Sequence, residues 1–369
     1  MPKKIGRTAT AFLRRCRLAW ADFWPQAKRA RAGDGVSVRR QIWELLRLRF
    51  GTGKLSIQDY YTLGVYRPEL PMDQKRKFVS TEAIFKTWPR INWTIVSLDK
   101  LLAYTVLAQQ GFKTPEIHAI VHVGRQYKET RSLRNVKEVM AYCCDGMTVP
   151  CVAKPIAGGS SRGVYVIKAV DQDAETIGFK DGSVQSLKQF ADELISTESG
   201  YMFQELLRPH VAIAEMCGDN LCTVCMMSIF EGASVHVHGS YWKIAVEPNM
   251  ADNYWRKGNL LALVDLADGT VKHCSTGQGV DYRRVGIHPV TQKAIGGFQL
   301  PDWNEAVAAV LNASRAFPGI VIQSWDVALT DNGPVLLEVN VGGIHLPQVA
   351  EQRGLYGGAF RAVLERNSH

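Results

Sequence analysis

The chain has 369 residues, of which 46% are hydrophobic and 21% charged, a composition typical of a folded globular protein and not of a disordered one. At about 150 residues a domain, this length predicts two or three domains. The formal net charge is +9, yet residues 1–50 hold thirteen Lys or Arg against three acidic residues, so the remainder is close to neutral. This distribution makes a nucleic-acid-binding body unlikely and leaves a basic N-terminal arm.

The sequence predicts a cytoplasmic protein. No uninterrupted apolar run is long enough to span a bilayer, and the first apolar segment contains arginines, unlike a secretory signal. The eight cysteines show no extracellular pattern, and a chain of this size needs no disulfides, so reduced thiols are expected.

The N-terminal region is expected to be largely helical. Apolar residues recur at helical spacing, with arginines between them, at Phe12, Cys16, Ala19, Trp20 and Phe23. Pro25 is the predicted end of this helix. The segment 10–31 could lie on an anionic membrane, peripheral to its inner face, or dock on the protein body with a solvated basic face. A loop at residues 31–35 then leads to a second predicted helix around residues 42–46, which the glycines at 51 and 53 end.

From Ile95 onward, strands and helices alternate. Ser97 or Asp99 can cap a helix over residues 98–110. Lys100 lies in the first turn of this helix, where a basic side chain opposes the helix dipole and calls for a compensating anion. When this helix is considered by itself, a surface lysine is the favoured interpretation.

A loop rich in glycine and serine, residues 155–163, joins a predicted strand over 149–154 to another over 164–170. Glycines let a backbone wrap closely around an anion, and serines add hydrogen-bond donors, so the loop could cradle phosphate; the alternative is a flexible turn. The β-branched residues after Gly163 exclude the strand, loop and helix order of a P-loop.

The second half of the chain is expected to be mainly antiparallel sheet. Strands are predicted over residues 201–207, 221–230, 234–246 and 260–265, followed by a helix over 303–317 and a hairpin over 322–340.

The hairpin brings two carboxylates face to face. With its turn centred on Asn332, Asp326 lies opposite Glu338, and strand alternation places Asn340 on the same face. The other face is predicted to be apolar, with Trp325, Val327, Leu329, Val335, Leu337 and Val339. Two opposed carboxylates repel unless a cation or proton lies between them, and carboxylate and amide oxygens suit Mg²⁺. The alternative is an ordinary solvated hairpin face.

Other conspicuous residues are not expected to bind metal. Cys222 and Cys225 fall on opposite strand faces and are expected in the core. His236 and His238 have no third metal ligand apparent, which favours a structural or substrate-facing role. His345 follows the hairpin into a loop and is a candidate for substrate contact.

Four segments taken in order resemble the ATP-grasp superfamily: LDK at 98–100, VAKPIAGGSSRGV at 152–164, FQELL at 203–207 and WDVALTDNGPVLLEVN at 325–340. The resemblance covers about residues 90–345 and is closest to the sugar-transfer-associated ATP-grasp family. It implies an α+β ATP-grasp fold with a nucleotide held between two α+β lobes. The implied domains are a basic helical region (1–90), a first lobe (91–145), a small nucleotide-binding subdomain (146–206) and a large catalytic lobe (207–369).

The resemblance also implies site residues. Lys100 and Lys154 would hold the ATP phosphates, and Asp326, Glu338 and Asn340 would ligate Mg²⁺. The flexible lid over the phosphates would include Gly158, Gly159, Ser160, Ser161 and Gly163. The hinge that meets adenine would consist of Gln204, Glu205, Leu206 and Leu207.

The activity implied is that of an ATP-dependent carboxylate–amine ligase, acting through an acylphosphate on a small-molecule, peptide or sugar-linked substrate. One departure is that Cys225 stands where family members commonly carry an arginine. The candidate catalytic cations are therefore Lys243, Arg256, Lys257 and Arg283. Alternatives are a kinase-like phosphotransferase and a non-catalytic nucleotide-binding scaffold in a polysaccharide assembly.

Overall fold

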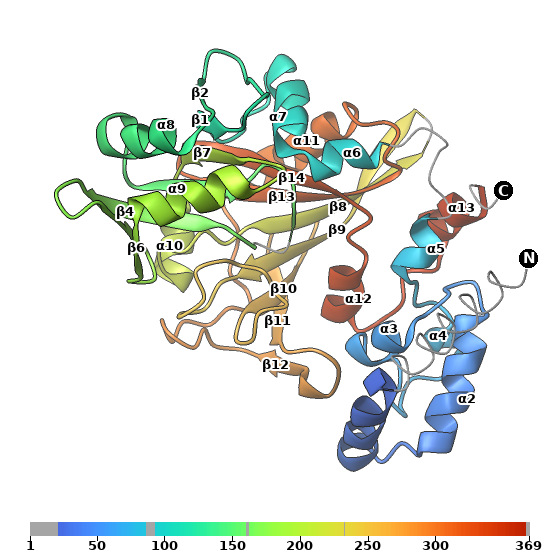
Figure 1. Ribbon diagram of the computed structural model, residues 1–369. Helices are drawn as coiled ribbons and strands as arrows, with labels where there is room; N and C mark the ends of the chain where they lie inside the picture. Colours follow the sequence, from blue (N-terminus) through green and yellow to red (C-terminus); the bar gives the residue numbers. More distant parts are fainter. Residues whose placement is uncertain (1–20, 86–92, 160–161, 232, 367–369) are drawn as a thin grey trace, which may run out of the picture. The chain divides into compact units, whose positions relative to one another are not determined.

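The computed structural model describes residues 21–85, 93–159, 162–231 and 233–366 (Figure 1). The chain forms two compact units. The first contains residues 1–90, 275–284 and 342–369, and the second contains 91–274 and 285–341. No helix in the described ranges is long and apolar enough to cross a membrane. The four-part domain division stays a prediction.

The first unit is mainly helical. Its elements are a helix over residues 21–34, α2 (Val38–Arg49), α3 (Ile57–Thr62), α4 (Met72–Lys75), α5 (Thr81–Phe85), the 3₁₀ turn η2 (Gly279–Asp281), α12 (His345–Glu351) and α13 (Gly358–Arg366). Helix α2 confirms the second predicted helix; Ser37 caps it by accepting a hydrogen bond from the Arg40 amide.

The predicted stop at Pro25 and the predicted loop at residues 31–35 are wrong. The helix continues to residue 34, and Gly35, at φ +67°, follows it. Phe23, Ala27 and Ala30 are buried along one side of this helix, and their packing outweighs the hydrogen bond that a proline removes. Residues 10–20 of the predicted basic helix lie outside the described residues.

A buried carboxylate ties the first unit together. Both Glu44 of α2 and Lys75 are almost fully buried, and the Lys75 ammonium lies 2.6 Å from Glu44 Oε2. The Tyr60 hydroxyl donates to the same oxygen at 2.6 Å, and Arg40 Nε donates to Oε1 at 2.8 Å. Both carboxylate oxygens of Glu44 therefore have hydrogen-bond donors, and its negative charge is balanced by Lys75.

Replacing Glu44 by alanine is expected to destabilise the protein by about 3–5 kcal/mol, because it leaves the Lys75 ammonium buried without a counter-charge. Urea denaturation measures the effect. The matched control is Asp73→Ala, which removes an exposed carboxylate from α4. A loss below about 1 kcal/mol in the Glu44 variant would contradict this account.

Two seven-stranded sheets are built mainly from residues of the second unit. The first has the order β2 (Arg131–Leu133), β1 (Ile117–Val121), β7 (Tyr201–Glu205), β3 (Cys151–Pro155), β4 (Tyr165–Asp171), β5 (Thr176–Phe179), β6 (Val184–Ser186). The second has the order β12 (Arg283–Val285), β11 (Val271–Thr276), β10 (Leu260–Val264), β9 (Ser234–Ile244), β8 (Val224–Glu231), β13 (Ile322–Thr330), β14 (Gly333–Val341). The predicted strands are present, with ends shifted by a few residues.

Helices cover these sheets (Figure 1). The first sheet packs one face against α8 (Val136–Ala141), with the π-helical turn η1 (Tyr142–Gly146), and α9 (Leu187–Ser196). Its other side shares a core with α7 (Lys100–Gln109), α10 (Val211–Cys217) and the second sheet, while α6 (Thr94–Leu98) precedes α7 in the chain. Helix α11 (Trp303–Ser314) packs on the second sheet. Asp99 caps α7, as one of the two predicted alternatives.

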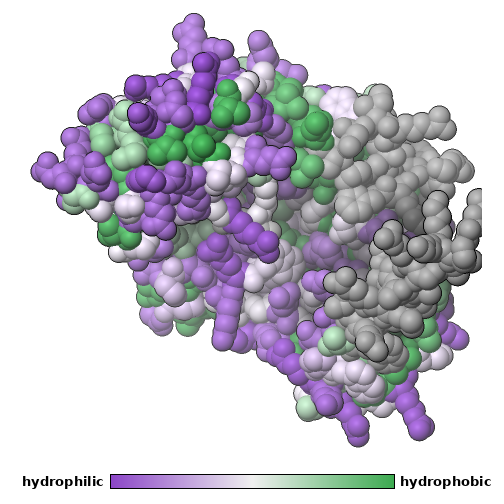
Figure 2. All heavy atoms as spheres, in the orientation of Figure 1, coloured by the Kyte–Doolittle hydropathy of each residue, from purple (hydrophilic) through white to green (hydrophobic). Residues whose placement is uncertain are grey.

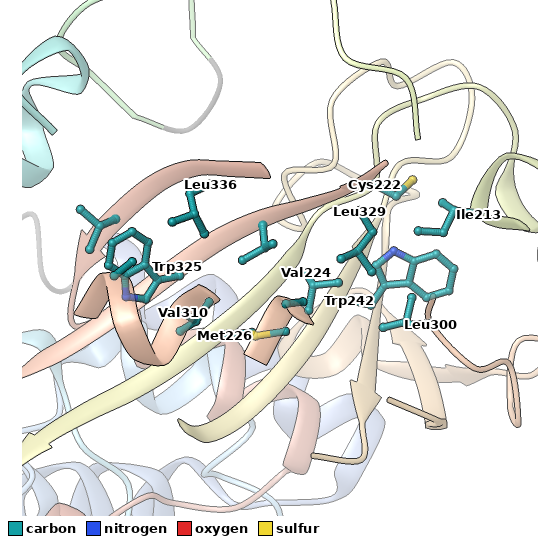
Figure 3. Close-up of a cluster of buried hydrophobic side chains, with 14 of the residues drawn as sticks. Ile213, Cys222, Val224, Met226, Trp242, Leu300, Val310, Trp325, Leu329 and Leu336 are labelled. Carbon is teal, nitrogen blue, oxygen red and sulfur yellow. The ribbon is translucent and has the colours of Figure 1, made fainter. Parts of the chain in front are cut away.

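The larger core surrounds the apolar face of the second sheet (Figure 3). Trp325 is fully buried, and its indole Nε1 donates to Ser314 Oγ of α11 at 3.1 Å and to Gln323 Oε1 at 2.9 Å. Hydrophilic residues are spread over the surface visible in Figure 2, with hydrophobic residues in smaller patches between them. This core fixes the orientation of β13, and therefore also the orientation of the opposite face of the strand, which carries Asp326.

The β13–β14 hairpin pairs Asp326 with Glu338, as predicted. The turn and the register of the two strands, however, differ from the prediction. Thr330 pairs with Gly333, so the turn lies between residues 331 and 332 and is not centred on Asn332. A bulge on β14, where Leu337 is the extra residue opposite the step from Asp326 to Val327, shifts the register by one residue and restores the predicted pairing. The prediction that Leu337 packs in the core is consequently wrong, because the bulge turns Leu336 into the core instead.

Candidate functional site

Lys100 connects the first turn of α7 to the glycine-rich loop and to the hairpin. Its ammonium donates to the Gly158 carbonyl at 2.7 Å and lies 3.6 Å from Glu338 Oε1. The base of the loop is held by a bridge between Asp99 and Ala157 and by the hydrogen bond from the Lys100 amide to the Ile156 carbonyl. The carboxylate of Glu338 thus provides the anion that the sequence requires near this helix terminus.

The glycine-rich loop is open around Gly158 and Gly159. Gly158 has φ +132°, a backbone conformation that other residues rarely adopt, and a Cβ at Gly158 or Gly159 would meet nothing within 4 Å. Gly163 is different, since a Cβ there would lie 2.6 Å from the Tyr201 hydroxyl. Ser160 and Ser161 lie outside the described residues.

Lys154 projects from the end of β3 and lies against Tyr104 of α7. Its ammonium donates to the Tyr104 hydroxyl at 3.1 Å, and that hydroxyl donates to the Leu337 carbonyl at 2.7 Å. Leu337 is the residue that the hairpin bulge turns out of the core, so the bulge frees a carbonyl that positions Tyr104. Tyr104 was not predicted as a site residue; a hydroxyl on the buried side of α7 is the only signal that could have indicated it.

The surroundings of Lys154 weaken its positive charge. Burial and then the nearby ammonium of Lys100 lower the pKa of Lys154 to about 7, although Glu338 acts in the opposite direction. Burial raises the pKa of Glu338, which Lys100 partly offsets. The positive charge of Lys154 is therefore weakened near pH 7, and a neighbouring polyanion would favour the charged form.

Asp326 belongs to a second group of charged side chains, together with Lys243 and Asp252. The Lys243 ammonium of β9 is 2.9 Å from Asp326 Oδ2 and 3.9 Å from Asp252 Oδ1. Burial opposes the charge on Lys243, but Asp252 and Asp326 together hold its pKa above the ordinary value. Asp252 is in turn fixed by Thr223, whose amide donates to Oδ2 at 2.7 Å and whose hydroxyl donates to the same oxygen. Lys243 is therefore a permanently charged side chain at this site.

The predicted metal ligands form a suitable donor set. Asp326 and Glu338 are direct cross-strand partners, so their β-carbons lie about 5 Å apart. Asn340, two residues beyond Glu338, shares its face of β14. Within the described ranges, no three His, Cys, Asp or Glu side chains are grouped to hold a metal, so an ion here would depend on the Asn340 amide and on solvent or substrate oxygens. The chemistry of these donors fits Mg²⁺, and the metal assignment stays a prediction.

The predicted adenine-binding segment lies at the end of β7. Gln204 is buried, and its Oε1 has no hydrogen-bond partner among the described residues. Glu205 Oε1 accepts a hydrogen bond from the Glu116 amide at 2.8 Å, while Leu206 and Leu207 are half-buried in the segment that follows. The unsatisfied amide oxygen fits a segment that meets a polar ligand, and the adenine assignment stays a prediction.

The remaining predicted cations come from other segments than Lys243. Arg256 and Lys257 are exposed in the loop between β9 and β10, and Arg283 belongs to the first unit. Their catalytic roles stay predictions.

Cys225 lies beside Asp326, bonds to Ser324 Oγ at 3.0 Å, and has a pKa raised to about 12 by burial and by Asp326. The thiol is therefore neutral and cannot replace an arginine.

Cys222, Cys225 and His345 have partners away from the predicted phosphate-binding lysines. Cys222 and Cys225 are both buried, as expected. Cys222 contacts Cys217, with the two Sγ atoms 3.5 Å apart, whereas Cys225 contacts Ser324. His345 Nε2 lies 2.9 Å from Asp59 Oδ1 within the first unit. Substrate contact by His345 stays a prediction.

Comparison with known proteins gives a family for the chain. The family model described as sugar-transfer associated ATP-grasp matches residues 79–362. No curated protein sequence matches. Among solved structures, the L-amino acid ligase from Bacillus licheniformis is 15% identical, with a TM-score of 0.39 over 75% of this chain and 48% of that one. The D-alanine–D-alanine ligase from Bacillus anthracis is 16% identical, with a TM-score of 0.38 over 74% of this chain and 67% of that one.

This chain thus spans about half of the length of the L-amino acid ligase that it resembles. The family model, by contrast, matches most of the present chain, and its range includes the loop at 158–163 and the β13–β14 hairpin. With its two sheets and flanking helices, the chain belongs to the sugar-transfer-associated ATP-grasp family and has an α+β ATP-grasp fold.

Proposed function

We propose that the protein is an ATP- and Mg²⁺-dependent carboxylate–amine ligase that forms an amide through an acylphosphate, on a small-molecule, peptide or sugar-linked substrate. The observation that carries the proposal is the meeting of Lys100, Lys154 and Glu338 from three separate elements, together with the ion pair between Lys243 of β9 and Asp326 of β13. This arrangement combines cations for a polyphosphate with carboxylates for a divalent metal.

In the proposed complex, Lys100 and Lys154 hold the phosphates of ATP, and the loop at 158–163 covers them. Lys100 exchanges its bond to the Gly158 carbonyl for a phosphate oxygen, which frees the loop to rearrange. Residues 204–207 receive the adenine, where the Gln204 side chain has an unused acceptor. Tyr104 positions Lys154 through its hydrogen bond to the ammonium.

Asp326, Glu338 and Asn340 would hold the metal, which supplies charge neutralisation for the transferring phosphoryl group. The reaction begins when a substrate carboxylate oxygen attacks the γ-phosphorus and ADP leaves. An amine then attacks the acyl carbon, phosphate leaves, and the nitrogen passes a proton to water or to the phosphate. Lys243, held charged by Asp252 and Asp326, provides a fixed cation for the oxyanion, and Arg256, Lys257 and Arg283 are further candidates.

Nucleotide binding is expected to be coupled to proton uptake. Since burial and Lys100 lower the pKa of Lys154 to about 7, the side chain is mostly neutral at pH 8, and phosphates that restore its charge draw a proton from the buffer. Titration calorimetry of ATP binding in buffers with different ionisation enthalpies should give an uptake of nearly one proton at pH 8, falling toward zero at pH 6. An uptake that does not vary over this range would contradict the role of Lys154.

The proposed activity is tested by incubating the protein with ATP, Mg²⁺ and a panel of carboxylates and amines. The expected result is ADP release together with a mass gain equal to the carboxylate plus the amine minus water. ADP with a stable phosphorylated product and no amide would replace the proposal by a phosphotransferase. Nucleotide binding without ADP release under any combination would favour a non-catalytic scaffold.

A further inference from the structure

Helix α2 turns a row of large apolar side chains toward solvent. Trp43, Leu46 and Phe50, just after its last residue, have exposed fractions of 47%, 57% and 83%. The spacing of three and then four residues places them along one side of the helix. The opposite side carries Gln41, Glu44, Leu45 and Leu48, all buried in the first unit. The exposed row is therefore additional to the face that α2 uses for folding.

Arginines are interleaved with this row. Arg39 and Arg47, four residues before and after Trp43, are exposed on the same side, and the Arg47 guanidinium lies 4.1 Å from the centre of the Trp43 ring. The only acidic residue of α2, Glu44, is buried and pairs with Lys75. The exposed side of the helix thus combines apolar area with positive charge and has no carboxylate of its own.

We propose that this face, Arg39, Trp43, Leu46, Arg47 and Phe50, is a docking surface for an anionic lipid bilayer; we call it the α2 stripe. Trp and Phe side chains gain free energy at the boundary between headgroups and acyl chains, and arginines four residues apart can reach phosphates on either side of the indole. The charge of the stripe is complementary to an anionic membrane surface, which attracts each added basic residue.

Two features favour a lipid surface over a protein partner. The exposed side of α2 carries both arginines beside the apolar positions and has no carboxylate, so its charge complements anionic headgroups. Trp43 is also already stacked with a guanidinium, an arrangement that suits a boundary where the ring enters an apolar layer and the charge remains with phosphate. The stripe is distinct from residues 10–31, for which the sequence suggested membrane contact, and it does not depend on the ligase activity.

Co-sedimentation of the full-length protein with vesicles tests the proposal. Binding is expected to vesicles of phosphatidylcholine containing about one-third phosphatidylglycerol, to weaken with added salt, and to be weak on phosphatidylcholine alone. The double variant Trp43→Ser/Phe50→Ser should bind the anionic vesicles at least about tenfold more weakly. Arg39→Gln/Arg47→Gln should remove most of the preference for anionic lipid. The matched control is Ile287→Ser/Val290→Ser, two residues of the second unit with exposed fractions of 54% and 53%.

Thermal melts and ADP release should be unchanged in the stripe variants, which separates lost docking from lost folding. The proposal is overturned if the wild-type protein stays in the supernatant with anionic vesicles at low salt, or if Trp43→Ser/Phe50→Ser binds as the wild type does. Conversion of a dimer to a monomer by that variant, without any vesicle binding, would instead assign the stripe to a second copy of the chain.

Discussion

Replacing Lys154 by methionine is expected to abolish nucleotide turnover and, at the same time, to stabilise the ligand-free protein. Lys154 is the proposed phosphate-binding cation, and its loss should lower ADP release by at least about 10³-fold, or about 4 kcal/mol in activation free energy. The ligand-free fold, however, holds this ammonium against Tyr104 and near the like charge of Lys100, without a carboxylate in direct contact. Methionine fills a similar volume and has no charge to desolvate.

The stability effect has a defined dependence on pH. The folded pKa of about 7 lies below the ordinary value of 10.5, so between these values the unfolded chain binds more protons than the folded one. Lys154 therefore destabilises the ligand-free protein fully below pH 7, and this cost disappears as the pH rises toward 10. Lys154→Met should raise the free energy of unfolding by about 2 kcal/mol at pH 6 and by little at pH 10.

Urea denaturation at both pH values measures this effect, and ADP release measures the loss of turnover. Lys168→Met is the matched control, because Lys168 is an exposed lysine on the neighbouring strand β4. A Lys154 variant that is less stable than the wild type at pH 6 would show that the ammonium is structural. A variant that retains turnover would remove Lys154 from the nucleotide site.

The sequence was informative where a function depends on local periodicity. The pairing of Asp326 with Glu338 could be predicted because turn residues separate two alternating strands, and the Asp99 cap followed from residue type and position. The bulge at Leu337 could not be predicted, since it depends on how β13 and β14 pack against the rest of the sheet and not on turn chemistry. The predicted turn was displaced, and the bulge was not predicted. These two errors have opposite effects on the register, so the predicted pairing of Asp326 with Glu338 is correct, whereas the predicted burial of Leu337 is wrong.

The partners of the site charges depend on contacts between distant parts of the chain. Lys243 was predicted as a candidate cation, but the carboxylate of Asp252 and the Thr223 donors that fix it come from separate loops. Tyr104 reaches Lys154 across 50 residues and Leu337 across 233. A single sequence indicates which side chains can carry charge, and the tertiary structure determines which of them are paired, buried or free to meet a ligand.

The charge of Glu338 is expected to matter for turnover far more than for folding. Burial raises the pKa of Glu338, so the folded protein holds its proton more tightly than the unfolded chain does, and the ionised form costs stability above the ordinary pKa of 4.5. Glu338→Gln removes that cost together with the 3.6 Å pairing to Lys100, and the free energy of unfolding at pH 7 should change by less than about 1 kcal/mol.

Turnover should respond very differently to the same substitution. Glu338→Gln is expected to lower Mg²⁺-dependent ADP release by about 10³-fold and to raise the Mg²⁺ concentration for half-maximal activity, because one of two anionic ligands is lost. Asn340→Asp, which adds a carboxylate to the same face, should lower the required Mg²⁺ concentration while reducing turnover. The matched control is Glu305→Gln on the exposed side of α11. Because the apolar face of the hairpin supplies its packing, unchanged ADP release and an unchanged Mg²⁺ response in both hairpin variants would place the metal elsewhere.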